Sequence, residues 1–252
     1  MLKALAKKYE REEFLVGDPS WFMHQVEGPS DQELLAFIAS SLSYGSRKQF
    51  LPRIQYLMEE SRGEVREWLL SGAYEHSVPD DDACFYRLYT NRTYRAFLRA
   101  LAELVGQYGS LRCFVEAIPV SQTNMKTDRK RDALTVIEAI TRWFRDHDSQ
   151  GVIPKDATSS CKRVCMFLRW MTRDNSPVDL GLWSDLIDKR SLIIPMDTHV
   201  VQEAMRLGLL TSRSTSMSNA RRLTQRLAEV FPDDPLLGDF ALFGLGVDDS
   251  RT

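Results

Sequence analysis

The sequence predicts a mainly α-helical protein. Apolar side chains recur at helical spacing through most of its 252 residues, and capping or helix-breaking residues separate these periodic segments. No segment alternates apolar and polar residues over a useful length, and no internal repeat is present. The contents of 43% hydrophobic and 27% charged residues are those of a chain that buries a core. We therefore expect an all-α fold.

The first half of the chain predicts a series of helices between turns. Residues 2–14 form a short helical pattern, and Gly17–Ser20 and Gly28–Asp31 predict turns. Ser30 or Asp31 can cap the next helix, which is apolar on almost every face from Leu34 to Leu42 and is therefore expected to be buried. Further helical patterns cover residues 50–58, 63–70, 81–90, 92–107, 111–118 and 131–145.

The second half predicts three more helices. The first begins at Lys162, and its residues Val164, Cys165, Phe167 and Leu168 form one apolar face with Lys162, Arg163, Arg169 and Arg173 around the rim. The second spans residues 218–230. Asp234, in the turn at 232–235, can cap a last apolar helix that ends at Gly244–Gly246.

Asp197 precedes another helical run. Pro195 biases Ile194 towards an extended conformation, so Asp197 stands in the N-cap position before residues 198–207, and Gly208 can end that helix. A capping role alone would contribute about 0.5–2 kcal/mol. Lys162 also has a local interpretation, as a solvated surface charge.

Composition limits the remaining possibilities. No apolar run is long enough to span a membrane and no signal peptide is evident, so we expect a cytoplasmic protein with no membrane partner. The cysteines Cys161 and Cys165 share one helix face without a nearby His or Cys pair, which favours buried thiols over a metal site. We expect neither a cofactor nor a metal, and the sequence does not predict an oligomeric state.

The net charge of −2 argues against wholesale coating of nucleic acid. Two segments are nevertheless locally basic, residues 126–131 and 155–173. Each is equally well interpreted as a solvated helix end or as a surface for transient contact with a phosphate backbone.

Two strings resemble a known superfamily. Pro195-Met196-Asp197-Thr198-His199-Val200, followed by Arg206-Leu207-Gly208-Leu209, resembles the "P-V-D-T-H-V…R-L-G-L" segment of the helix-hairpin-helix DNA glycosylases, which include endonuclease III and the 8-oxoguanine glycosylases. Lys162, in Ser160-Cys161-Lys162-Arg163, resembles the lysine of their bifunctional members. More closely, the strings "CKR…MFLRWM", "DTHV" and Asp239–Gly246 resemble an uncharacterised bacterial family of conserved hypothetical proteins over most of the chain.

The resemblance implies a two-lobed helical fold, with residues 31–150 in a central lobe and residues 151–252 plus 1–30 in the lobe that carries Lys162 and Asp197. These two residues would be catalytic, in excision of a damaged base through a lysine Schiff base. The segment "ELLAFIASSLSYGSRKQ" is similar to a superfamily helix and loop that approach the substrate. The DNA-contacting candidates are Tyr44, Ser46, Arg47, Gln49, Arg163 and Arg169; a glycine-capped helix followed by a polar surface turn is the other interpretation of the first four.

The sequence departs from the superfamily pattern before Lys162. No glycine lies between Gly151 and Gly181, so the glycine-rich hairpin that normally precedes the lysine is degenerate, and Lys162 and Asp197 are 35 positions apart. The partner implied by the resemblance is damaged or abasic duplex DNA. A nucleic-acid-binding or interaction protein without catalysis and an enzyme of free nucleosides or RNA remain alternatives.

Overall fold

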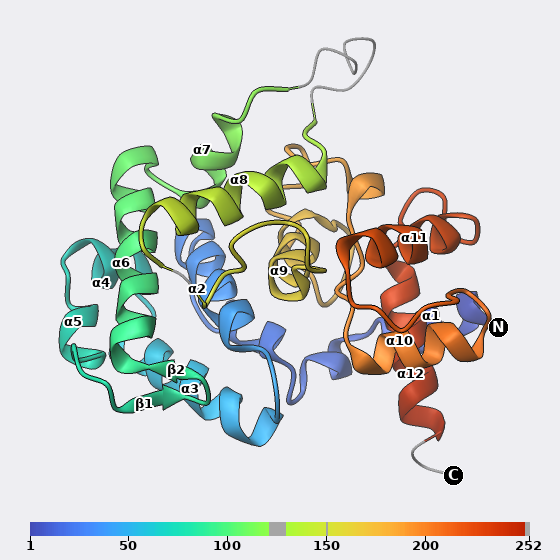
Figure 1. Cartoon of the computed structure of the whole chain (residues 1–252), viewed down its shortest axis with the longest axis horizontal. Helices are drawn as coiled ribbons and strands as arrows, with labels where there is room; N and C mark the ends of the chain where they lie inside the picture. Colours follow the sequence, from blue (N-terminus) through green and yellow to red (C-terminus); the bar gives the residue numbers. More distant parts are fainter. Residues whose placement is uncertain (121–129, 150, 250–252) are drawn as a thin grey trace. The chain divides into compact units, whose positions relative to one another are not determined.

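The computed structural model of the chain describes residues 1–120, 130–149 and 151–249 (Figure 1). Within these residues the chain is mainly helical, which confirms the predicted all-α class, and a two-stranded sheet is the one sheet described. The chain divides into two compact units: unit 1 contains Met1–Val16, Gln122–Ile137 and Ala157–Thr252, and unit 2 contains Gly17–Ser121 and Glu138–Asp156. Residues 17–30, which the sequence analysis grouped with the first helix, thus fall in unit 2.

Unit 2 is organised around a buried helix, α2 (Pro29–Leu42). Every residue of α2 from Glu33 to Leu42 is buried, as its apolar faces predicted. Helix α2 begins at Pro29 with Gly28 as N-cap, so neither Ser30 nor Asp31 caps it; the Asp31 carboxylate instead accepts the N–H of Arg66. The other elements of unit 2 are η2 (Pro19–His24), α3 (Arg47–Glu60), α4 (Val65–Leu70), α5 (Tyr74–Ser77), α6 (Asn91–Tyr108) and α7 (Leu111–Glu116).

Residues 84–90 form a β-hairpin, so the helix predicted for residues 81–90 is wrong. Strand β1 (Cys84–Tyr86) pairs antiparallel with β2 (Tyr89–Thr90), and Arg87 makes the turn with a left-handed φ of 51°. Phe85 stacks on Tyr94 of α6, with ring centroids 4.4 Å apart. Aromatic residues favour strands that pack on one face, and here that packing overrides the helical spacing of the side chains.

Helix α8 (Ala133–Asp146) crosses from unit 1 into unit 2 and closely matches the amphipathic segment predicted at 131–145. Its second half contributes to the core of unit 2, where Phe144 stacks with Phe37 and Phe97 at centroid distances of 5.4 and 5.3 Å. The Trp143 indole N–H donates to the Ala100 carbonyl at 3.0 Å. These contacts join α8, α2 and α6 in one apolar core.

Unit 1 is built around the C-terminal helix α12 (Leu237–Asp249), which packs against α1 (Leu2–Tyr9) and α10 (Thr198–Arg206) (Figure 1). A Cβ on Gly244 would lie 2.2 Å from the Tyr9 ring, so this glycine permits the close approach of α1 and α12. Helix α12 continues beyond the predicted end at Gly244–Gly246, and α1 ends before the predicted residue 14. The unit also contains η1 (Glu12–Leu15), α9 (Lys162–Thr172), η4 (Lys189–Ser191) and α11 (Met217–Ala228).

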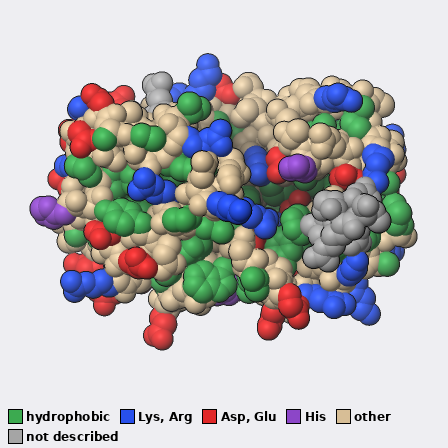
Figure 2. Space-filling view, turned by 90° about the horizontal axis from the view of Figure 1, so that it is seen from below, with side chains coloured by type: hydrophobic (Ala, Val, Ile, Leu, Met, Phe, Trp, Pro, Cys, Tyr) green, Lys and Arg blue, Asp and Glu red, His purple; other side chains and the backbone are tan. Residues whose placement is uncertain are grey.

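Charges of both signs are mixed over the surface. On the face drawn in Figure 2, Lys and Arg side chains are interspersed with acidic, apolar and uncharged groups. This distribution agrees with the small net charge of −2. Across the described ranges, no helix combines the length and the apolar composition that a membrane crossing requires.

Candidate functional site

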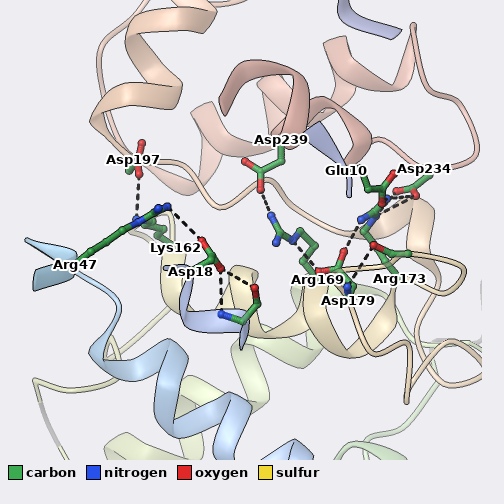
Figure 3. Close-up of polar contacts among 12 residues, drawn as sticks. Glu10, Asp18, Arg47, Lys162, Arg169, Arg173, Asp179, Asp197, Asp234 and Asp239 are labelled. Atoms are coloured by element: carbon green, nitrogen blue, oxygen red, sulfur yellow. Dashed lines mark hydrogen bonds and ion pairs between the residues drawn. The ribbon is translucent and has the colours of Figure 1, made fainter. Parts of the chain in front are cut away.

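Lys162 and Asp197 form an ion pair in unit 1. Lys162 is the first residue of α9, Asp197 is the N-cap of α10, and the Lys162 Nζ lies 3.1 Å from the Asp197 Oδ2 (Figure 3). The two side chains keep 31% and 34% of their surfaces exposed, so water and solutes can reach both groups. The structure thus brings together the two residues that the sequence analysis proposed as catalytic, although 34 residues separate them in the chain.

The start of α9 is fixed by backbone pairing rather than by a hairpin. Ser160 donates its N–H to the Thr215 carbonyl at 3.0 Å, and Met217 donates to the Thr158 carbonyl at 3.1 Å. Cys161 then takes a left-handed conformation (φ 47°) as the N-cap of α9. Residues 151–161 contain turns and isolated bridges, so no helix directly precedes α9 where a helix-hairpin-helix motif would have one.

A hydrogen bond joins the two halves of the site. The Ser160 hydroxyl donates to the carbonyl of Met196, the residue before Asp197, at 3.4 Å. The Ile194 N–H donates to the Thr224 hydroxyl at 3.0 Å, which attaches the extended segment before Asp197 to α11. The side chains of these residues are largely buried, so the backbone on both sides of the ion pair has little freedom to move.

Asp197 uses its two carboxylate oxygens for different partners. The Oδ1 accepts the N–H of Val200 at 3.0 Å, which confirms the predicted N-cap, and Oδ2 faces Lys162. Burial alone would raise the pKa of Asp197, but the charge of Lys162, the Val200 N–H and the Lys162 hydrogen bond together hold it below its ordinary value. Asp197 is therefore a carboxylate at neutral pH.

A buried network of arginines and carboxylates lies in the same unit (Figure 3). Arg169 pairs with Asp179 at 3.3 Å and with Asp239. Arg173 bonds Glu10 at 2.6 Å and Asp234 at 2.9 to 3.0 Å, and it also pairs with Asp179. The two arginine side chains are only 5% and 2% exposed.

The helical pattern predicted Arg169 and Arg173 on a solvent-exposed rim, and this prediction is wrong because both side chains are buried. Arg169 lies in the last turn of α9 and Arg173 is the C-cap of that helix, and both side chains are buried among carboxylates from other segments. Arg169 in this arrangement holds acidic side chains and is not presented to a DNA backbone. Arg163, also a predicted DNA contact, is half-buried near the start of α9.

Asp239 is the member of the network with an unusual protonation tendency. Burial raises the pKa of Asp239, the nearby carboxylates Asp197 and Asp179 raise it further, and the Arg169 pair opposes them without cancelling the rise. Sequence reasoning did not select Asp239 as a site residue. The one available signal was its position in the first turn of a helix, directly before a run of residues without charge (240–247).

The other predicted contacts lie in unit 2, between the end of α2 and the first turn of α3. Tyr44 is half-buried, and its hydroxyl donates to the Tyr86 carbonyl at 3.4 Å. Ser46 and Gln49 are exposed, Ser46 as the N-cap of α3 and Gln49 within its first turn. Arg47 is also exposed and pairs with Asp18 at 3.2 Å.

Asp18 is a second residue that sequence reasoning missed. Its buried carboxylate accepts the N–H and the hydroxyl of Ser20 at 3.1 and 2.7 Å, in addition to the Arg47 contact. The segment 17–20 predicted only a turn. Asp18 does cap η2, and it also sets the orientation of Arg47.

The cysteines and the basic segments give little evidence for a functional site. Cys161 and Cys165 are buried, as predicted, and burial raises the pKa of the Cys165 thiol well above its ordinary value. Within the described part of the chain, no group of three or more His, Cys, Asp or Glu residues is placed to hold a metal ion. The predicted basic segment 126–131 lies outside the described residues up to residue 129.

Comparison with known proteins gives a family and no function. No curated protein and no solved structure matches the chain significantly. A family model described as "Protein of unknown function (DUF2400)" matches residues 18–248, which include Lys162, Asp197 and the buried network except Glu10. Because this match covers most of the 252 residues, the chain belongs to the DUF2400 family.

Proposed function

We propose that the protein is a DNA glycosylase with associated AP-lyase activity, acting on damaged or abasic duplex DNA. The observation that carries the proposal is the accessible pair of Lys162 Nζ and Asp197 Oδ2, 3.1 Å apart at the beginnings of two helices. The similarity of the surrounding sequence to that of the helix-hairpin-helix glycosylases supports the same assignment.

In this mechanism Lys162 is the nucleophile. Its neutral amine attacks C1′ of the sugar as the base departs and forms a Schiff base, from which the strand is cleaved by elimination. The ion pair with Asp197 contains the ammonium form of Lys162, so one proton must leave before attack. Binding of a nucleotide between the two groups would separate them and begin this step.

Asp197 acts through its charge. Its lowered pKa keeps it ionised, so it can stabilise the positive charge that develops on the sugar as the bond to the base breaks. The Val200 N–H holds the other oxygen and orients the carboxylate before substrate arrives. Moving a base out of the stack costs a few kcal/mol. This cost is lowest for a damaged or mispaired base, so such bases are favoured as substrates.

The test is borohydride trapping on a duplex with an abasic site and on one with 8-oxoguanine. The wild type should form a covalent adduct that is absent from Lys162→Gln. Lys189→Gln is a matched control because Lys189 pairs with Asp174 at 2.7 Å and is 32% exposed in the same unit. An adduct that persists in Lys162→Gln, or no adduct from the wild type on either duplex, would contradict the proposal.

A second candidate is a nucleic-acid-binding protein without catalysis. It is favoured by the absence of a helix in residues 151–161 and by the engagement of Lys162 in a salt bridge. Binding to abasic or undamaged duplex that weakens with added salt, without trapping, would support this candidate, because phosphate contacts release counterions. Binding that does not respond to salt would count against it.

A further inference from the structure

We infer that Asp239 is a second catalytic carboxyl of this site and that it donates a proton to the departing base. The inference rests on the proposed function, since a base must be excised for the proton to be needed. Asp239 lies in the first turn of α12, and α12 packs directly against α10, the helix that Asp197 caps. Three observations carry it.

The first observation is how Asp239 is held. One oxygen, Oδ2, is bound by the Arg169 guanidinium, which also contacts Asp179. For the other oxygen, no hydrogen-bond donor is found among the residues that the structure describes, and 12% of the side chain is exposed. In Figure 3 this second oxygen points away from Arg169, towards the side on which Asp197 and Lys162 lie.

The second observation is the balance of charge around Asp239. Two arginines, Arg169 and Arg173, face four acidic groups, Glu10, Asp179, Asp234 and Asp239. With all six ionised, the network carries an excess of two negative charges. Uncompensated charge is costly away from water, so a proton within this cluster is favoured.

The third observation is which carboxyl takes that proton. Arg173 is committed to Glu10, Asp179 and Asp234, so Asp239 has only a share of Arg169. The charged groups that face Asp239 are Arg169 from α9, Asp179 from the segment after α9, and Asp197 before α10. Burial and the two acidic neighbours raise the pKa of Asp239, so its surroundings favour the protonated form.

The proposed step is balanced within the site. Lys162, after losing a proton to water, forms a bond from Nζ to C1′ while the bond from C1′ to the base nitrogen breaks. The electron pair of the broken bond goes to the base nitrogen, which takes the proton of the Asp239 carboxyl. Asp239 becomes a carboxylate beside Arg169, and Asp197 stabilises the positive charge on the sugar.

The variant Asp239→Asn separates base excision from lyase chemistry. Its amide oxygen can still accept a hydrogen bond from Arg169, but the amide cannot supply an acidic proton. An abasic duplex has already lost its base and needs no such proton. Loss of a general acid should therefore slow single-turnover excision by about 100-fold or more, whereas borohydride trapping on the abasic duplex should remain within about threefold of wild type.

The matched control is Asp234→Asn, which removes a carboxylate from the same network. Asp234 contacts Arg173 through both oxygens and is 14% exposed, close to the 12% of Asp239. In Asp234→Asn, both base excision and trapping should stay near their wild-type rates.

Asp239→Glu keeps an acid at this position and should recover part of the excision rate that Asp239→Asn loses. In wild type, excision should fall as pH rises through the raised pKa of Asp239, and Asp239→Asn should lack this dependence.

The probes are an abasic duplex and duplexes with 8-oxoguanine or hypoxanthine. Equal loss of trapping and excision in Asp239→Asn would indicate a structural role and overturn the inference, as would unchanged excision. A wild type that traps the abasic site but excises neither base would overturn the inference and leave the lyase intact. A wild type that does not trap at all would instead overturn the proposed function.

Discussion

Replacing Arg173 by methionine should destabilise unit 1 strongly. The Arg173 side chain is 2% exposed, and its guanidinium is shared by Glu10, Asp179 and Asp234. These acids come from three separate segments, so the ion pairs of Arg173 connect the end of α1, the segment after α9 and the turn before α12. Methionine has a similar length and no charge, and it therefore removes the cation without leaving a large cavity.

The magnitude follows from what remains behind. Removing one partner of a buried ion pair costs about 3–5 kcal/mol, because the other partner stays buried without compensation. The Asp179 side chain is completely buried and would retain only Arg169, while Glu10 and Asp234 are 15% and 14% exposed and can recover some contact with water. We therefore expect a loss in the middle of that range for the free energy of unfolding of unit 1.

Indole signals of ¹⁵N-tryptophan-labelled protein allow the unit to be followed by itself. Trp170 and Trp183 are fully buried in unit 1, whereas Trp68 and Trp143 belong to unit 2. In a urea titration, the signals of Trp170 and Trp183 should be lost at a clearly lower urea concentration in Arg173→Met than in wild type. The free energy at zero denaturant follows by linear extrapolation.

The matched control is Arg226→Met. Arg226 pairs with Glu229 at 3.1 Å in the same unit, but the two side chains are 57% and 65% exposed, so this pair is expected to contribute at most about 1 kcal/mol. A loss in Arg173→Met no larger than that of the control would refute the reasoning, because the buried network would then contribute no more than a surface ion pair.

Three further predictions concern single carboxylates. Asp197→Ala should lower stability by about 0.5–2 kcal/mol because the Val200 N–H loses its capping acceptor, whereas Asp197→Asn should keep the cap; urea unfolding of both variants would show whether they differ. The folded protein raises the pKa of Asp239 above its ordinary 3.8, so the stabilising contribution of its proton is complete below that value and is lost as pH rises through the raised one. The melting temperature of Asp239→Asn relative to wild type should therefore increase with pH above 4, and a difference that does not change with pH would contradict this. Glu33→Ala should cost unit 2 about 1–3 kcal/mol, measured by chemical denaturation, since the buried Glu33 carboxylate accepts the Leu111 N–H at 2.8 Å; no loss would mean that this contact is dispensable.

Local signals allowed part of the site to be predicted from the sequence. Asp197 follows a proline and precedes a periodic segment, and these short-range features sufficed to predict an N-cap, which Val200 confirms. Lys162 was placed at the start of its helix for similar reasons. Hairpin 84–90 was missed because its aromatic residues also fit helical spacing, and only packing against Tyr94 distinguishes the two.

The buried network could not be predicted in this way. Arg173 bonds Glu10 across 163 positions of the chain and Asp234 across 61. No periodicity within α9 distinguishes an arginine at the exposed margin of an apolar face from one that meets a distant carboxylate inside the protein. A charged residue is usually exposed, so the pattern alone favoured the rim for both Arg169 and Arg173.

The two carboxyls that we assign to the site, Asp197 and Asp239, differ in what surrounds them, and this difference decides what each can do. Asp197 has an N–H on one oxygen and an ammonium beside the other, and these partners hold its pKa low despite burial. Asp239 has one oxygen on a shared arginine, is more deeply buried and faces other acids, and these surroundings raise its pKa above the ordinary value. Two residues of the same type whose surroundings shift their pKa in opposite directions suit two opposite tasks, one as a lasting negative charge and one as a source of protons. Removal of a base by a lysine requires both, because the sugar gains positive charge while the leaving nitrogen gains an electron pair.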